Sequence, residues 1–385
     1  MTTRLAARVR QRIDELDARG LRRSLTSPSG IDLSSNDYLG LSDHPRLVQQ
    51  MIDAVAREGV GSTGSRLLRG ERESFSAIER RFADWKGTDR ALYFSSGYLA
   101  NLAVLTTLTE PGDVVYSDAS NHASLIDGLR LSRAARVIFP HNDVDALERL
   151  LHEPTGPGQR FVVTESLFSM DGDMAPLADY AALCRETDTA LVVDEAHAVG
   201  IYGSRGSGLV EEAGVDADGL VTVNTAGKAL GVSGAFVAGP DWAIEHLVQR
   251  ARPFIFTTAP PPALAAALDA SLTIVCDEPE RRARLLSRAR VMRDRLAEAG
   301  IDVAPGRSQI IPIVIGDNAR AVAVSRDLQH DGFDVRAIRP PSVPEGTARL
   351  RIAVNVNLSE STIERFVSAL TTATRRLGPC VEASS

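Results

Sequence analysis

The chain has 385 residues, a hydrophobic content of 44%, a charged content of 24% and a formal net charge of −7. This composition is ordinary for a folded globular protein that can bury a core in one large domain or two closely joined ones. The acidic balance argues against nucleic acid as the main partner, and no apolar run approaches membrane-spanning length. The cysteines (Cys184, Cys276 and Cys380) lack the spacing of a disulfide framework or a metal site, which favours reduced thiols in a cytoplasmic protein.

The first fifty residues are expected to form a helix, a short strand and part of a second helix. Residues 4–19 show a helical apolar stripe, and their acidic residues favour an amphipathic surface helix over a transit peptide. Residues 31–41 read IDLSSNDYLGL, a short strand followed by a polar turn whose Asn and Asp usually bond the backbone. The second helix begins at residue 43 and ends near residue 57.

A glycine-rich loop follows at residues 59–70, which read GVGSTGSRLLRG. Such loops let a backbone approach an anion closely. No strand leads into this loop and it has no Walker lysine, so by itself it is a weak sign of phosphate binding. Residues 71–86 are predicted to form another helix.

From residue 91 onward, short apolar runs alternate with helical stretches. The predicted strands cover residues 91–94, 114–116, 136–139, 161–164, 190–193, 220–223 and 235–238. Most of these runs are apolar throughout, as expected for strands covered by helices on both faces. The alternation predicts an α/β domain with a mostly parallel sheet, in which ligands bind beyond the carboxyl ends of the strands.

Chemically capable side chains follow five of these strands. They are Ser96-Gly97-Tyr98 at the start of a helix, His122, Ser169, Asp194 with His197, and Thr225 with Lys228. A Ser/Gly turn can bind an anion or simply cap its helix, and a lone histidine in a turn is more often structural. Convergence on one edge of a sheet is stronger evidence for a site than any one of these residues.

Lysine is nearly absent from the chain, which contains Lys86 and Lys228 against 41 arginines. An amine can form a Schiff base and can lose its proton when desolvated, whereas a guanidinium does neither easily. Lys228 lies in a Gly/Ala loop, 34 residues after Asp194 at a strand end. Together with the Ser/Gly helix start, these residues suit pyridoxal 5′-phosphate. Lys228 would bind the cofactor aldehyde, and Asp194 would keep the ring nitrogen protonated.

A second, smaller α+β domain is predicted after a long charged helix over residues 271–299. Its expected strands cover residues 309–315, 333–336 and 348–354, and its helices cover 318–330 and 359–376. The expected division is an N-terminal segment at 1–50, a large cofactor-binding domain at 51–270 and the small domain at 271–385.

Ordered motifs between about residue 21 and residue 375 resemble the α-oxoamine synthases, a pyridoxal-phosphate family with the aspartate-aminotransferase fold (fold type I). The motifs are SSNDYLGL, SSGYLAN, NHASL, HNDVDALE, FSMDGDMAPL, VDEAHAVG, GKALGVSG and IRPPSVPEGTARLRI. The resemblance implies a homodimer with active sites between subunits, and a decarboxylating condensation of an amino acid with an acyl thioester. The segment RPPSVPEGTARLR favours the biotin-synthesis member, which uses L-alanine and a pimeloyl thioester carried by CoA or by a carrier protein. Glycine C-acetyltransferase and 5-aminolevulinate synthase are the alternatives within the family.

The resemblance also implies roles for individual residues on the cofactor side. Lys228 corresponds to the imine-forming lysine, Asp194 to the partner of the ring nitrogen, and His122 to the residue stacked on the ring. The other cofactor residues would be Ser169 and His197 at the ring, Gly97, Tyr98 and Thr225 near the phosphate, and Thr258 reaching the cofactor phosphate of the other subunit.

On the substrate side, the resemblance points to Arg22, Ser342 and His122. Either Arg339 or Arg351 would hold the carboxylate of the amino acid, and this choice stays open. No metal is expected.

Two local departures from the family are expected to change the acyl-thioester pocket. Ala229 and Leu230 follow the lysine where many relatives have glycine and an aromatic residue, and Glu71 and Phe75 replace a tyrosine and a histidine. Two other classes are weaker hypotheses. An ordinary aminotransferase would consume no thioester, and a non-catalytic phosphate-binding protein would leave Lys228 and Asp194 unexplained.

Overall fold

The structure is a computed structural model that describes residues 3–216 and 219–376, so Cys380 lies outside the described residues. The chain divides into two compact units. The larger consists of Asn36–Ser169 and Asp173–Ala283, and the smaller of Met1–Ser35, Met170–Gly172 and Arg284–Ser385.

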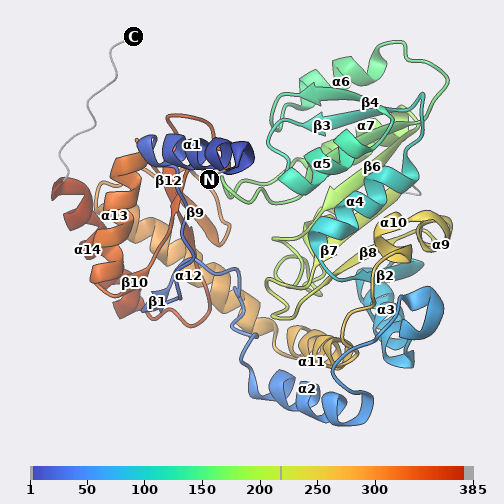
Figure 1. Cartoon of the computed structure of the whole chain (residues 1–385), viewed down its shortest axis with the longest axis horizontal. Coiled ribbons are helices and arrows are strands. Elements are labelled where there is room, and N and C mark those ends of the chain that lie inside the picture. The colour runs from blue at the N-terminus through green and yellow to red at the C-terminus, as the bar shows by residue number, and fades with distance from the viewer. Residues whose placement is uncertain (1–2, 217–218, 377–385) are drawn as a thin grey trace. The chain divides into compact units, whose positions relative to one another are not determined.

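The larger unit is built on a seven-stranded sheet with the order β2-β8-β7-β6-β5-β3-β4 (Figure 1). The strands are β2 (Arg90–Phe94), β3 (Val114–Asp118), β4 (Ala135–Phe139), β5 (Arg160–Glu165), β6 (Thr189–Asp194), β7 (Leu220–Thr225) and β8 (Ala235–Gly239). All neighbouring strands are parallel except that β8 is antiparallel to both β2 and β7. The predicted α/β fold with a mostly parallel sheet is therefore confirmed.

Helices cover both faces of this sheet. One face packs against α4 (Gly97–Leu108), α5 (Ala123–Leu131), α9 (Asp241–Arg250) and α10 (Arg252–Ile255). The other face packs against α3 (Glu73–Lys86) and α7 (Leu177–Glu186), and α6 (Val144–His152) contacts α7. On that second face the ring of Phe82 stacks on Phe236 of β8, with centroids 4.0 Å apart. Coverage on both faces explains why the central strands are apolar at consecutive positions.

The remaining helices of the larger unit are α2 (Pro45–Glu58), the short π-helix η1 (Arg66–Gly70), α8 (Leu209–Glu212) and α11 (Ala263–Asp277). The single helix predicted over residues 271–299 is wrong, because α11 ends at Asp277 and α12 (Pro279–Glu298) begins two residues later. Proline has no N–H and disfavours a helical conformation in the residue before it. Glu278 accordingly leaves the helical region, with φ −117° and ψ 61°.

The smaller unit has the predicted α+β character. Its antiparallel sheet has the order β11-β12-β9, and a separate strand pair joins β1 to β10 in parallel. Its elements are α1 (Arg4–Ala18), β1 (Ile31–Asp32), β9 (Ile310–Gly316), α13 (Asn318–His330), β10 (Phe333–Asp334), β11 (Ala337–Ile338), β12 (Ala348–Ala353) and α14 (Glu360–Arg376). Because β1 pairs with β10, residues up to Ser35 group with the C-terminal part of the chain. Meanwhile α2 packs on α11 in the larger unit. These units differ from the expected division at residues 50 and 270.

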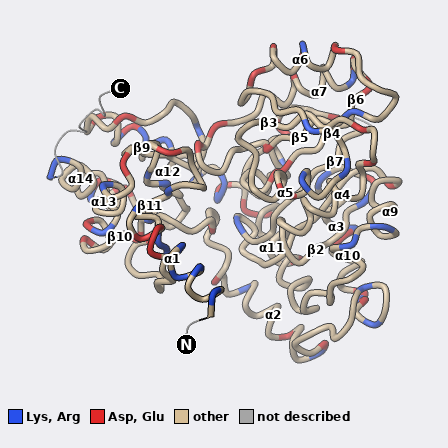
Figure 2. The backbone as a smooth tube through the Cα atoms, turned by 45° about the horizontal axis from the view of Figure 1, so that its top comes forward, with Lys and Arg blue, Asp and Glu red and all other residues tan. Residues whose placement is uncertain are grey.

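Charged residues of both signs are interspersed along both units (Figure 2). Among residues 3–216 and 219–376, no helix has the length and apolar character needed to cross a bilayer.

One of the two lysines has a structural role. Lys86, at the end of α3, forms an ion pair with Glu195 and donates a hydrogen bond to the carbonyl of Ser207 at 2.8 Å. The side chains of Lys86 and Glu195 are 2% and 0% exposed. The second carboxylate oxygen of Glu195 accepts the N–H of Val210 at 2.9 Å. This buried pair ties the end of α3 to the segment directly after β6.

Replacing Lys86 with Met should strongly lower the free energy of unfolding, because Glu195 would remain buried without its cation. Removing one partner of a buried ion pair costs about 3–5 kcal/mol, which urea denaturation will measure. As a control, Arg90→Met removes a half-exposed cation paired with Asp241 and Glu245. Exposed ion pairs contribute about 1 kcal/mol or less. Equal losses in the two variants would contradict a structural role for the Lys86–Glu195 pair.

Candidate active site

Lys228 lies in the turn after β7, beside an imidazole held in a fixed orientation. Its Nζ is 2.9 Å from Nε2 of His197. Nδ1 of His197 is 2.7 Å from the hydroxyl of Tyr38, which donates to Oδ1 of Asn36 at 2.9 Å. This donor order puts the imidazole proton on Nδ1 and leaves Nε2 to accept from the lysine amine. The SSNDYLGL segment, from which sequence analysis expected backbone bonding, thus orients His197.

Asp194 ends β6, is 5% exposed, and has hydrogen bonds to both carboxylate oxygens. Oδ1 accepts the N–H of Ala196 at 2.8 Å, and Oδ2 accepts Nδ2 of Asn101 at 2.6 Å. Asn101 also donates to Oγ of Ser124, which is 2.8 Å from Nδ1 of His122. Sequence analysis gave Asn101 no role. The available signal was the one amide side chain in the mostly apolar helix α4.

His122 is both a helix cap and a neighbour of the charged groups. As the N-cap of α5, its Nδ1 accepts the N–H of Ser124 at 3.2 Å. Burial is the largest influence on its pKa and lowers it. The charge of Lys228 lowers it further, and the charge of Asp194 acts in the opposite direction. The net pKa lies below the ordinary value of 6.5, so the imidazole is neutral at pH 7. A neutral, oriented ring is suited to stacking on an aromatic cofactor.

A second buried carboxyl group, which sequence analysis missed, lies at the neighbouring strand end. Glu165 ends β5 and pairs in register with Asp194 of β6. Burial, followed by the charge of Asp194, raises the pKa of Glu165 to about 8. Its Oε1 is buried and has no hydrogen-bond partner among the described residues. Buried polar atoms are normally paired, so an orphaned oxygen beside Asp194 is consistent with a site for a bound polar group.

The start of α4 forms a cradle that suits a phosphate. The hydroxyl of Ser96 caps the helix by accepting the N–H of Leu99 at 3.3 Å. A Cβ on Gly97 would lie 2.4 Å from Oγ1 of Thr225, so only glycine lets this hydroxyl approach the helix start. Backbone N–H groups at a helix N-terminus and a nearby hydroxyl favour an anion. With the amine of Lys228 and the carboxylate of Asp194, this donor set fits pyridoxal 5′-phosphate.

The structure assigns the predicted residues to the two units as follows. The larger unit contains all predicted cofactor residues, namely Gly97, Tyr98, His122, Ser169, Asp194, His197, Thr225, Lys228 and Thr258. Tyr98 is 42% exposed and donates its hydroxyl to Asp127 of α5, and Thr258 is exposed on the loop between α10 and α11. The smaller unit contains the substrate candidates Arg22, Arg339, Ser342 and Arg351.

The two candidate arginines have different surroundings within the smaller unit. Arg339 donates to the carbonyl oxygens of Gly20 and Arg22. Arg351 lies within β12 and is 7% exposed. Ser342 is exposed, with its N–H bonded to the carbonyl of Arg339 at 3.1 Å.

The residues that depart from the family are mostly packed in the interior of the larger unit. Ala229 and Leu230 are 1% and 0% exposed. Phe75 is fully buried and stacks on Tyr93 with centroids 6.1 Å apart, whereas Glu71 is exposed and pairs with Arg66. Their expected effect on an acyl pocket stays a prediction.

Protonation of His122 should oppose folding in mild acid. Because the folded-state pKa lies below the unfolded value, the neutral ring contributes stability above about pH 6.5. That contribution is lost as pH falls toward the folded-state pKa. His122→Asn keeps a good N-cap and cannot titrate. The stability of the wild-type protein relative to this variant should therefore fall between pH 7 and pH 5 in urea denaturation. A stability of wild type relative to the variant that stays constant or rises on acidification would contradict the neutral assignment.

Comparisons with known proteins agree with this geometry. Residues 28–370 match the model of the aminotransferase class I and II family. The chain is 45% identical over 382 residues to 8-amino-7-oxononanoate synthase of Geobacter sulfurreducens, covering 95% of this chain and 97% of the relative. It is 47% identical over 373 residues to that of Anaeromyxobacter dehalogenans, covering 93% of each. A solved serine palmitoyltransferase from S. paucimobilis, with a bound pyridoxal-phosphate adduct, matches with a TM-score of 0.89 at 29% identity, covering 96% of this chain and 97% of that one. The predicted aspartate-aminotransferase-like fold is thus confirmed, and the chain belongs to the aminotransferase class I and II family.

Proposed function

We propose that the chain is an 8-amino-7-oxononanoate synthase with pyridoxal 5′-phosphate as its cofactor. It condenses L-alanine with pimeloyl-CoA, or with pimeloyl carrier protein, and releases 8-amino-7-oxononanoate, carbon dioxide and the free thiol. A carbon–carbon bond forms between Cα of alanine and the acyl carbonyl carbon, while the Cα–carboxylate and thioester C–S bonds break. The observation that carries the proposal is the 45–47% identity to synthases of this name over more than nine-tenths of both chains.

The buried groups at the strand ends suit this chemistry. Bound pyridoxal 5′-phosphate supplies an electron sink for the carbanion formed next to the nitrogen of an amino acid. Lys228 supplies the amine that holds the cofactor aldehyde and then moves a proton at Cα of the substrate. His197, which accepts from Lys228 in the structure, orients that amine and contacts the ring oxygen. Asp194, fixed by Asn101 and by its own turn, holds the proton on the ring nitrogen.

The remaining cofactor contacts are assigned by the resemblance to the α-oxoamine synthases. His122 and Ser169 contact the ring, and Gly97, Tyr98 and Thr225 lie on the phosphate side. Thr258 reaches the phosphate of a second subunit, since the active unit is a homodimer. We place this enzyme in the cytoplasm, where its acyl donor is either the CoA ester or the carrier-protein ester.

On the substrate side, Arg22 and Ser342 contact the substrates, and Arg351 rather than Arg339 binds the carboxylate of alanine. The guanidinium of Arg339 donates to the carbonyls of Gly20 and Arg22 within the smaller unit. Arg351 lies on a buried central strand, whose backbone holds the base of its side chain in one position. A rigid fork of donors is the usual partner of a carboxylate.

A second candidate function is serine palmitoyl transfer, because solved serine palmitoyltransferases match the fold with TM-scores up to 0.90. That enzyme also transfers an acyl group to an amino acid. The identity to it is 29–31%, below the 45–47% identity to the oxononanoate synthases of Geobacter sulfurreducens and Anaeromyxobacter dehalogenans.

Incubation of the purified protein with L-alanine and pimeloyl-CoA should release free CoA and carbon dioxide in equal amounts, together with 8-amino-7-oxononanoate identified by mass spectrometry. The value of kcat/KM for this pair should be at least about 100-fold higher than for three other pairs, which corresponds to about 2.7 kcal/mol. Those pairs are serine with palmitoyl-CoA, glycine with acetyl-CoA and glycine with succinyl-CoA. Product should be absent without added thioester.

One control variant and two contrary outcomes make this assay decisive. Lys228→Ala should abolish the visible absorption of the bound cofactor and the release of CoA together. A preference for serine with palmitoyl-CoA would instead assign the second candidate function, and transamination without thioester would overturn both.

Replacing Arg351 with Lys should raise the KM for L-alanine by about 10-fold to 100-fold, because a hydrogen bond to a charged group contributes about 1.5–3 kcal/mol. The matched variant Arg339→Lys should leave that KM within about threefold of wild type, since its contacts are to backbone carbonyls within the smaller unit. Steady-state kinetics at saturating thioester measure both values. The reverse pattern would move the carboxylate contact to Arg339.

A further inference from the structure

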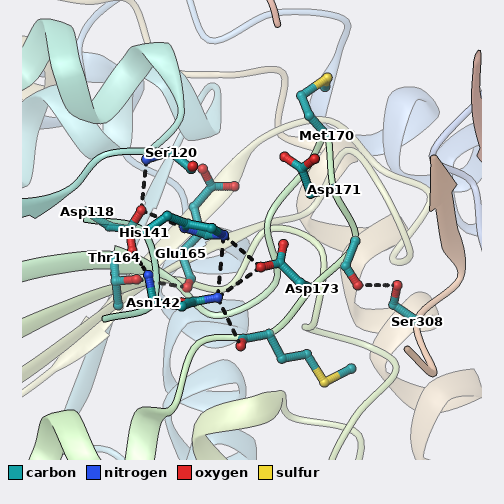
Figure 3. Close-up of polar contacts among 12 residues, drawn as sticks. Asp118, Ser120, His141, Asn142, Thr164, Glu165, Met170, Asp171, Asp173 and Ser308 are labelled. Carbon is teal, nitrogen blue, oxygen red and sulfur yellow. Dashed lines mark hydrogen bonds and ion pairs between the residues drawn. The ribbon is translucent and has the colours of Figure 1, made fainter. Parts of the chain in front are cut away.

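His141 lies between two carboxylates that come from different segments of the larger unit (Figure 3). Its Nδ1 is 2.8 Å from Oδ1 of Asp118, and its Nε2 is 2.6 Å from Oδ2 of Asp173. An imidazole that faces a carboxylate on both nitrogens must donate from both, and only the protonated ring can do this. His141 is the first residue of the HNDVDALE segment, and the sequence pattern alone does not indicate this role for it.

The first carboxylate shapes the turn that presents His122. Asp118 ends β3, and its Oδ1 also accepts the N–H of Ser120 at 2.8 Å. Its carbonyl accepts the N–H of Asn121 at 3.3 Å. The next residue in the chain is His122, the N-cap of α5. The position of Asp118 therefore determines where this turn delivers the imidazole of His122.

The second carboxylate closes the hairpin that presents Ser169. The carbonyl of Asp173 accepts the N–H of Phe168 at 3.0 Å across this hairpin. Oδ2 of Asp173 also accepts Nδ2 of Asn142 at 2.9 Å (Figure 3). The ring of His141 packs against Phe168 at right angles, with centroids 4.4 Å apart. Since Ser169 follows Phe168 directly, the contacts of His141 hold the hairpin at the residue before the serine.

Burial and charge support a permanent cation at this junction. The side chains of His141 and Asp118 are 29% and 0% exposed. Burial alone would lower the pKa of His141, but the hydrogen bonds and charges of Asp118 and Asp173 raise it to about 10. Tyr180, whose phenol lies near Asp118, has its own pKa raised mainly by burial and stays neutral. The two carboxylates are thus bridged by one positive charge across the neutral pH range.

We propose that His141 is a positioning residue for the cofactor. Together with Asn142, which also donates to both carboxylates, its doubly bonded ring fixes the separation of the turn carrying His122 and the hairpin carrying Ser169. The inference rests on the cofactor and on the roles proposed above for these two residues. His141 itself is assigned no contact with cofactor or substrate. Loss of His141 removes the charged link between the two loops and leaves the bonds of Asn142 to the same two carboxylates. The loops can then shift, so the groups at the cofactor ring lose their alignment while the sheet beneath them stays folded.

The test uses the holoenzyme of His141→Gln and a matched control, Leu147→Ala. Leu147 is fully buried on α6, six residues after His141, and its loss removes apolar packing but no polar bridge. We expect His141→Gln to weaken the binding of pyridoxal 5′-phosphate about tenfold, as loss of charged hydrogen bonds allows. The circular dichroism of the bound cofactor in the visible range should fall at the same time. Leu147→Ala should lower the unfolding midpoint and leave both cofactor measurements unchanged.

A second variant protects the test against poor folding. Asp173→Asn keeps the shape of its side chain but removes the charge that attracts His141, so it should change both cofactor measurements in the same direction by a smaller factor. The inference would be overturned if both variants fold normally and their cofactor binding and dichroism stay within twofold of wild type. That result would leave the cofactor assignment intact. A wild-type protein that shows no visible band with pyridoxal 5′-phosphate would overturn the cofactor assignment, and this inference with it.

Discussion

The parallel pairing of β3, β5, β6 and β7 is the constraint on which the candidate site depends. Parallel strands all end at one edge, so the residues that follow them share that edge whatever their distance in sequence. The register then sets the neighbours: Glu165 lies opposite Asp194, and Asp194 lies opposite Val223, two residues before Thr225. Backbone hydrogen bonds in a sheet buried on both faces therefore determine the spacing of the cofactor residues.

Three charged groups near this edge have partners from distant segments. Asp194 receives the amide of Asn101 from α4, Glu195 receives the amine of Lys86 from α3, and His141 joins β3 to the hairpin after β5. Burying an unpaired charge is costly, so any packing that separated these partners would be strongly disfavoured. The polar contacts thus select one arrangement of the loops, while apolar packing supplies most of the stability.

Features that depend on local pattern were predictable from the sequence. The strand predicted at residues 190–193 lies within β6 (Thr189–Asp194). The polar residues that follow the apolar runs lie at the carboxyl ends of the sheet strands. The position of β8, antiparallel between β2 and β7, was not predicted, because hydrophobic runs carry no information on strand order. Asn101, Tyr38 and Glu165 were also missed as site residues, since a buried amide, phenol or carboxyl acquires its role only from partners brought by the fold. His122 combines a structural role with a role in the site. Its Nδ1 caps helix α5 and also connects to Asp194 through Ser124 and Asn101.

The scarcity of lysine has a practical consequence for the loaded protein. The chain carries two side-chain amines, and that of Lys86 is 2% exposed within its ion pair. Apart from the α-amino group, acylating reagents that seek amines therefore have one principal target in the folded protein, the side chain of Lys228. An aldehyde bound there removes that target. The mass added beyond that on the α-amino group would thus count cofactor-free molecules, and loss of cleavage at Lys228 by a lysine-specific protease would place the modification without a labelled substrate.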